Sequence, residues 1–258
     1  MRAQQATMTM TLPTEQATAE EVLAWGLHEF GDRLALCTGF QAEGMVLLDM
    51  ASKIAPGGFR VVTIDTGRLP EETYELISVV RQRYGVSVEI IYPERSEVES
   101  MVTSHGPNLF YEAVAKRRLC CEIRKVRPLA RKLLEFDAWA AGLRRLQSKS
   151  RRDVKKVEID SRHGDILKLS PLADWTEEQV HEYSRRHHVP VHKLYAKGYT
   201  SIGCAPCSRA IMEGEDHRAG RWWWELDATK ECGINFSTNG VARRDLDVLL
   251  EDVLRSAR

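Results

Sequence analysis

No run of apolar residues in this chain of 258 residues approaches the roughly 18 that a membrane-spanning helix needs. The first 18 residues, rich in Thr, Gln and Ala, also lack the apolar core of a signal peptide. Net charge is absent too, because 37 Lys and Arg balance 37 Asp and Glu, so no global charge attracts nucleic acid or an anionic membrane. We therefore expect a cytoplasmic protein that binds neither nucleic acid nor membrane, with residues 1–18 as a flexible lead-in.

Internal repeats and low-complexity linkers are missing as well, and short apolar runs alternate instead with segments of helical periodicity. Strands are predicted at Leu34–Cys37, Arg60–Ile64, Val86–Tyr92, Ala138–Ala141 and Ile166–Leu169, and helices at Glu20–Phe30, Glu43–Ile54, Pro70 to about Tyr84, Cys120–Phe136, after Asp174-Trp175, and Asp245–Leu254. This alternation is typical of βαβ units. The sequence therefore predicts an α/β fold with a doubly wound, mainly parallel sheet.

Two loops leave predicted strands at the edge where such sheets bind ligands. Thr38–Met45 has the glycine spacing of a Walker A loop, but Met45 stands where the lysine should be, so a P-loop NTPase is excluded. What remains is a glycine turn before a helix N-terminus, where backbone N–H groups can face an anion. The second loop, Asp65–Pro70, also joins a strand to a helix start and can equally be a plain turn.

Six cysteines stand out, four of them in two tight pairs, Cys120-Cys121 and Cys204-Ala205-Pro206-Cys207. Four thiolates can hold zinc or an iron–sulfur cluster, and adjacent cysteines suit a cluster better because its irons are separate attachment points. A redox dithiol, a vicinal disulfide and plain buried cysteines remain open. Cys232 is left for chemistry, and Cys37 is expected to pack at a strand end.

Local positive charge is high although the whole chain is neutral. Residues 144–156 contain seven cations and only one acidic residue, Asp153, and Arg218 and Arg221 flank the approach to three consecutive tryptophans. Arginine forks suit phosphate or sulfate oxygens, so this excess favours one small, multiply charged anion as ligand. A solvated basic face is the alternative.

Taken together, the motifs resemble the thioredoxin-dependent adenylyl-sulfate reductases and the related phosphoadenylyl-sulfate reductases. The resemblance runs from about Leu34 to Ile234, and its motifs are Ile64–Leu69, Cys120–Val126, Gly142–Arg145 with Gln147-Ser148, Ser201–Cys207, Gly220–Glu225 and Lys230–Gly233. It implies an adenine-nucleotide α-hydrolase-like fold, with residues 19–212 as the nucleotide-binding domain and 213–258 as a C-terminal segment.

Roles for individual residues follow from the same resemblance. It implies one 4Fe–4S cluster on Cys120, Cys121, Cys204 and Cys207, and Cys232 as the nucleophile that attacks the sulfur of adenosine 5′-phosphosulfate (APS). Thr38, Gly39 and Thr66 would hold the nucleotide, and Lys125, Arg152, Arg218 and Arg221 would surround the phosphosulfate. Thioredoxin or glutaredoxin would then release sulfite, and a homo-oligomer is expected.

The sequence also departs from the family pattern and leaves alternatives. Asn235 stands where the family commonly has histidine, Thr38 and Gly44 where serine and aspartate are frequent, and many relatives end just beyond the nucleophile. In this family the four-cysteine set implies APS, but use of the 3′-phosphorylated form (PAPS), or of both, stays open. Further alternatives are an ATP-pyrophosphatase-type transferase on the same fold and a non-catalytic metal or cluster sensor.

Overall fold

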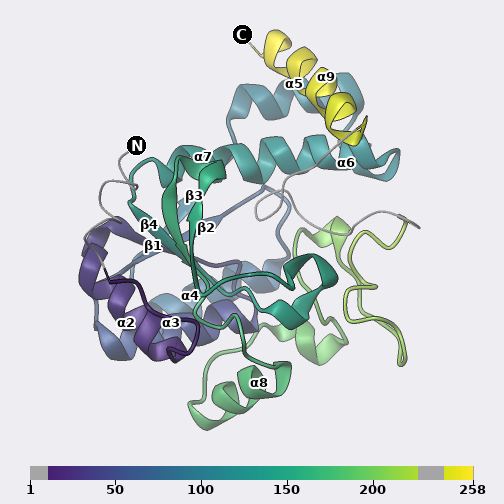
Figure 1. Cartoon of the computed structure of the whole chain (residues 1–258). Helices are drawn as coiled ribbons and strands as arrows, with labels where there is room; N and C mark the ends of the chain where they lie inside the picture. Colours follow the sequence, from purple (N-terminus) through teal and green to yellow (C-terminus); the bar gives the residue numbers. More distant parts are fainter. Residues whose placement is uncertain (1–10, 226–240, 258) are drawn as a thin grey trace. The chain divides into compact units, whose positions relative to one another are not determined.

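The computed structural model describes residues 11–225 and 241–257 (Figure 1). The strands are β1 Leu34–Cys37, β2 Arg60–Ile64, β3 Val88–Ile91, β4 Ala138–Ala141, β5 Val157–Asp160 and β6 Ile166–Leu169. The helices are α2 Ala19–Phe30, α3 Ala42–Ile54, α4 Glu71–Tyr84, α5 Arg95–His105, α6 Val114–Cys121, α7 Arg127–Leu133, α8 Glu177–Arg186 and α9 Val241–Ser256. Within these residues, none of the helices has the length and apolar character needed to cross a bilayer.

The strands form one six-stranded sheet in the order β3-β2-β1-β4-β6-β5. β1 pairs in parallel with β2 and β4, and β4 pairs in parallel with β6. β5 pairs antiparallel with β6. The predicted doubly wound, mainly parallel sheet is therefore confirmed.

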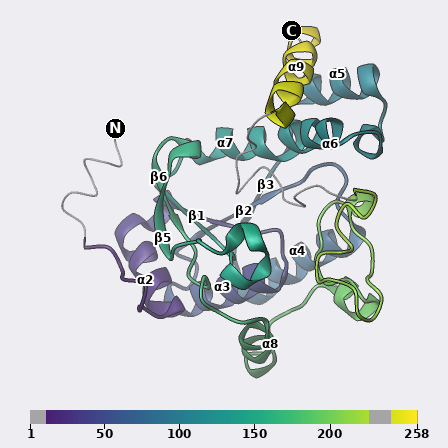
Figure 2. The same ribbon diagram turned by 45° about the vertical axis from the view of Figure 1, so that its right-hand side comes forward.

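Helices α2 and α3 contact β1 and each other, and both views show them side by side next to the sheet (Figures 1 and 2). For α2, the sequence explains both where the helix begins and which face it buries. Thr18 caps α2 through a capping box with Glu21, and the buried face of α2 includes Val22 and Leu23. Burying these apolar faces against the sheet is what stabilises both helices.

The strand order reverses between β1 and β4, where doubly wound sheets bind ligands. Leu36 pairs with Ala140 and Cys37 with Ala141, so both strands end at the same level. The next residue after β4 is Gly142, and a Cβ atom there would lie 2.7 Å from the Cβ of Glu43 in α3. Glycine thus lets the N-terminus of α3 approach this strand end closely.

Two predicted elements differ from the observed ones, and the helix α5 and the strand β5 were not predicted. The antiparallel strand β5 was not predicted, because Val157–Asp160 is short and half charged. β3 is shorter than the predicted Val86–Tyr92. The predicted helix Cys120–Phe136 is wrong in its start and continuity, because α6 begins at Val114 and a π-helical turn, Glu122–Val126, separates it from α7.

The described residues divide into two compact units that differ from the predicted domain boundaries. The first, called here the sheet unit, comprises residues 11–63, 70–90 and 132–196. The second, the cysteine unit, comprises residues 64–69, 91–131, 197–225 and 241–257. The cysteine unit is therefore assembled from separate stretches of the chain, which no linear boundary at residue 212 could represent.

The cysteine unit has its own small apolar core, to which α9 contributes. α9 packs against α5 and α6, and the two views agree on this (Figures 1 and 2). Leu246 and Val253 are buried with Met101 and Leu119, and the Ser100 hydroxyl donates to the Val253 carbonyl over 3.0 Å. The predicted tail helix thus exists and supplies part of the core of this unit.

Replacing Val253 by Asp should lower the free energy of unfolding by roughly 3 kcal/mol or more, because a charge would be buried without a partner. The matched control is Val248→Asp on the same helix, since Val248 is 60% exposed and should tolerate the charge. Urea denaturation measures both. Equal losses in the two variants would show that α9 does not pack as described.

Candidate functional site

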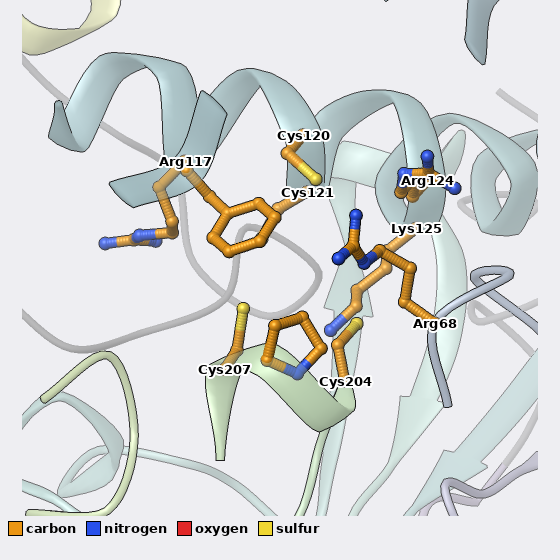
Figure 3. A pocket seen from close by; sticks show the side chains of 10 residues that line it. Arg68, Arg117, Cys120, Cys121, Arg124, Lys125, Cys204 and Cys207 are labelled. Atoms are coloured by element: carbon orange, nitrogen blue, oxygen red, sulfur yellow. The ribbon is translucent and has the colours of Figure 1, made fainter. Parts of the chain in front are cut away.

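The four paired cysteines line a single pocket in the cysteine unit (Figure 3). Besides Cys120, Cys121, Cys204 and Cys207, its lining residues are Arg68, Phe110, Arg117, Arg124, Lys125 and Pro206. The space between the side chains is about 290 Å³, part of it open to solvent. Thiols and cations therefore share one small site.

Each cysteine pair is held by a different local structure. Cys120 and Cys121 are the last residues of α6, and the π-helical turn that follows brings Arg124 and Lys125 into the same pocket. Such turns often occur at functional sites. Cys204 and Cys207 stand at the two ends of a 3₁₀ turn, in which the Cys207 N–H donates to the Cys204 carbonyl over 2.9 Å.

The donor set of this pocket, four buried thiols, is of the kind that can hold a metal ion or an iron–sulfur cluster. All four cysteines are at most 9% exposed and none forms a disulfide. Among the residues that the structure describes, no three Cys, His, Asp or Glu side chains are arranged to hold one metal ion. A zinc ion requires all its sulfurs at about 2.3 Å, whereas a 4Fe–4S cluster takes four thiolates spread over a larger body.

Lys125 and Thr66 both reach the sulfur of Cys204. Figure 3 shows the Lys125 amine beside this sulfur, and the Thr66 hydroxyl lies 3.2 Å from it. Burial disfavours the thiolate, but Lys125, Thr66 and Arg221 outweigh it and hold the pKa of Cys204 below its ordinary value. Burial raises the pKa of Cys207 to about 11, so the two thiols of one turn differ in acidity.

Arg124 fixes the loop that carries Thr66. Its guanidinium donates to the Thr66 carbonyl over 2.7 Å and lies 3.4 Å from the position of a Cβ atom at Gly67. Gly67 also has φ of +69°, a conformation that glycine adopts most easily. The loop's Arg68 carbonyl accepts from the Ala205 N–H over 2.8 Å, so this loop contacts the cysteine turn directly.

Arg221 also contacts the turn that carries Cys204 and Cys207. Its guanidinium donates to the Cys207 carbonyl over 3.1 Å and to the Ser201 hydroxyl over 3.3 Å, and the residue is only 5% exposed. A Cβ atom at Gly203 would lie 2.4 Å from this guanidinium. These contacts give Arg221 a positioning role for Cys207, and its predicted contact with the substrate stays a prediction.

A buried ion pair connects α6 with the stretch that precedes Cys232 in sequence. Arg117 donates to both carboxylate oxygens of Glu225, over 2.8 and 2.9 Å, and the two side chains are 1% and 3% exposed. The guanidinium of Arg117 also lies 4.5 Å from the ring centroid of Trp222. Glu225 compensates the charge of Arg117, which would otherwise be buried in the pocket wall at high cost.

The nucleotide loop predicted from Thr38 and Gly39 lies in the sheet unit. The Thr38 hydroxyl accepts from the Phe40 N–H over 2.9 Å, and a Cβ atom at Gly44 would lie 2.2 Å from this hydroxyl. A glycine at position 44 therefore leaves the room that the Thr38 hydroxyl occupies. No atom of the described residues lies within 4 Å of a Cβ atom at Gly39, which is exposed.

Of the remaining predicted site residues, Arg152 lies in the sheet unit, exposed on the loop after β4. Arg218 lies in the cysteine unit, where its N–H donates to Asp216 over 2.8 Å. Cys232 is outside the described residues, so its role stays a prediction. Cys37 lies at the end of β1, and desolvation raises the pKa of its thiol to about 12, as expected for an unreactive cysteine.

Sequence reasoning missed the pocket residues Arg68, Phe110, Arg117 and Arg124. Two of the four lie in motifs that the sequence analysis had already singled out. Arg68 belongs to the loop Asp65–Pro70, and Arg124 directly precedes Lys125 in a quoted motif. Arg117 gave a weaker signal, a charge three residues before Cys120, and Phe110 gave none.

A doubly wound sheet with an open glycine turn at its switch point, combined with a pocket of four thiols, defines an α/β protein of the nucleotide-binding kind. Residues 33–210 match the phosphoadenosine phosphosulfate reductase domain. The chain belongs to this family, which confirms the resemblance and the adenine-nucleotide α-hydrolase-like fold.

Curated relatives extend the match over most of the chain. The adenosine 5′-phosphosulfate reductase of Allochromatium vinosum is 44% identical over 234 residues, covering 91% of this chain and 90% of the relative. The reductase of the same name from Burkholderia cepacia is 45% identical over 236 residues, covering 90% and 93%. The phosphoadenylyl-sulfate reductase of Candida auris, solved as a phosphate complex, has a TM-score of 0.63 at 29% identity and covers 79% of this chain and 94% of its own.

Replacing Glu225 by Gln should lower the free energy of unfolding by about 3 to 5 kcal/mol, because the Arg117 charge would lose its buried partner. Glu112→Gln is the matched control. Glu112 pairs with Lys116, which lies in α6 next to Arg117, but the Glu112 side chain is 53% exposed. That control should cost at most about 1 kcal/mol. Urea denaturation of both variants measures the difference, and a negligible loss in Glu225→Gln would contradict the buried pair.

Proposed function

We propose that this enzyme reduces APS to sulfite and AMP in assimilatory sulfate reduction, with thioredoxin or glutaredoxin as the electron donor. The observation that carries the proposal is the pocket in which four buried cysteines meet Lys125, in a chain 44 to 45% identical to two proteins named adenosine 5′-phosphosulfate reductase. Thiol exchange of this kind requires a compartment that keeps thiols reduced, as the cytoplasm does. A homo-oligomer is also part of the proposal.

The reaction runs in two thiol-exchange steps. The Cys232 thiolate attacks the sulfur of APS, a sulfur–sulfur bond forms, and the bond from sulfur to the phosphate oxygen breaks as AMP leaves with its electron pair. A thiolate of the reductant then attacks Cys232 and expels sulfite. A second thiol of the reductant frees Cys232 as a disulfide forms, so the two electrons come from one dithiol.

The protein's main task in the first step is to position and neutralise anions, since AMP is already a good leaving group. We assign phosphosulfate binding to Lys125, Arg152, Arg218 and Arg221, and nucleotide binding to Thr38, Gly39 and Thr66. Lys125 is the best supported of these, because it faces the pocket and also reaches Cys204. Thr66 contacts Cys204 as well, so it would serve the cysteine site in addition to the nucleotide.

We further propose that Cys120, Cys121, Cys204 and Cys207 hold a 4Fe–4S cluster. Their burial and their common pocket support this choice, because four thiolates complete the ligand set of such a cluster. The cluster would supply a fixed charge that orients Lys125 and the neighbouring cations, whereas the electrons enter through Cys232. Arg221 contacts the turn that carries Cys204 and Cys207 directly, and Arg124 holds the Thr66 loop that contacts the same turn.

Use of PAPS, or of both nucleotides, is the alternative within the family. The Candida auris enzyme is named for PAPS, but its identity to this chain is 29%, below the 44 and 45% of the two relatives named for APS. A transferase of the ATP-pyrophosphatase type is less favoured. Its phosphate loop is not reproduced by Thr38–Met45, and Cys232 would have no part in its reaction.

Incubation of anaerobically purified protein with APS, without reductant, should add one sulfonate to the peptide that contains Cys232. Mass spectrometry of the digested protein measures the adduct, and added thioredoxin should remove it as sulfite. Cys232→Ser should form no adduct and should have no turnover. PAPS in place of APS tests the alternative substrate, and an adduct on a different cysteine would reassign the nucleophile.

Cys121→Ser should lose most of the bound iron and acid-labile sulfide, which should amount to about four of each per chain in the unmodified protein. Cys37→Ser is the matched control, because Cys37 lies in the sheet unit and outside the pocket. Chemical iron and sulfide analysis measures both variants. Zinc in place of iron, or an equal loss from Cys37→Ser, would overturn the cluster assignment.

A further inference from the structure

In the basic segment 144–156 of the sheet unit, the buried cations pair with other side chains of the protein. Arg144 donates to Glu43 over 2.9 Å, Arg151 contacts Gln147, and the Lys156 amine lies 2.7 Å from a carboxylate oxygen of Asp174. Arg152, in contrast, is exposed and has no hydrogen bond or ion pair with any described residue. Arg152 is thus the arginine of this segment that is available to an anion from solution.

Glu15, which is far from this segment in sequence, contacts residues at both of its ends. One of its carboxylate oxygens pairs with Arg145, and the other accepts from the Lys156 N–H over 3.1 Å. Arg145 also donates to the Val154 carbonyl over 2.8 Å. A single carboxylate therefore ties the beginning of the segment to its end, which removes conformational freedom from the residues between them.

A second contact fixes the short turn that carries Glu15. The Ala17 N–H donates to the Thr14 carbonyl over 3.1 Å, and the Ala17 carbonyl accepts from the Lys156 amine over 2.5 Å. Lys156 is only 2% exposed, so this bond is shielded from water. We call residues 14–17 the N-terminal clasp; in contrast to the flexible lead-in predicted for residues 1–18, these residues are held in place.

We propose that the N-terminal clasp positions Arg152 for the anionic end of the substrate, with Glu15 as a positioning residue, an inference that rests on the proposed function. The clasp precedes residue 33, where the match to the family begins, so it adds to the site from outside the family domain. Holding the segment closed keeps Arg152 in a narrow set of positions. Less conformational entropy of the segment is then lost when the anion binds.

The sign of one measurable effect separates positioning from simple electrostatics. Removing the Glu15 charge makes the surroundings of Arg152 more positive, which by Coulomb attraction alone would strengthen the binding of an anion. Loss of the clasp would weaken binding instead, because the segment would have to be ordered by the substrate. Glu15→Gln should therefore raise KM for APS by about three- to fivefold, the scale of a half-exposed ion pair plus one hydrogen bond, with kcat nearly unchanged.

The experiment compares Glu15→Gln with Glu15→Asp, which keeps the charge and should recover part of the affinity. Glu20→Gln is the control, because Glu20 is an exposed charge in the first turn of α2. Limited trypsin digestion of the same proteins, with mass spectrometry of the cut sites, measures opening of the segment without any substrate. Cleavage after Arg152 and Lys155 should be faster in Glu15→Gln than in Glu20→Gln.

An unchanged or lowered KM in Glu15→Gln would overturn the positioning role, even if cleavage became faster. Unchanged cleavage would overturn the clasp itself. Failure of the proposed function has a different signature, since the unmodified protein would then neither turn over APS nor form the adduct on Cys232. The digestion still decides whether the clasp exists in that case.

Discussion

Burial of four thiols together is the constraint around which the cysteine unit is organised. A buried thiolate loses its hydration and is repelled by neighbouring thiolates, so its charge needs nearby cations or hydrogen-bond donors. Lys125 and the Thr66 hydroxyl supply them for Cys204. The cations in turn must be compensated, and Glu225 does this for Arg117. This chain of charge compensation explains why so small a unit contains so many buried ionic groups.

In the sheet unit the charge to be compensated is positive, because seven cations follow one another closely after β4. Carboxylates from distant parts of the sequence resolve it. Glu43 at the start of α3 holds Arg144, and Glu15 before α2 holds Arg145, whereas Arg152 remains exposed. Structural and available cations are therefore separated by tertiary contacts, and a count of charges along the chain does not distinguish them.

Prediction from sequence succeeded where a local pattern is sufficient. The apolar runs gave β1, β2, β4 and β6, and Thr176 with Gln179 gave the capping box of α8. It failed at the π-helical turn Glu122–Val126, because helical periodicity looks the same on both sides of such a turn. It also missed β5, whose pairing depends on β6 lying beside it.

The sequence by itself determined the fold class, the family and the two cysteine pairs, because each depends on residue types at short, fixed spacings. Only the tertiary structure decided what each cation does. Arg117 pairs with Glu225 from 108 residues away, and Arg221 reaches back to the cysteine turn. Which charge is buried and which partner compensates it depends on contacts between distant segments. Those contacts are fixed by packing, which no local pattern records.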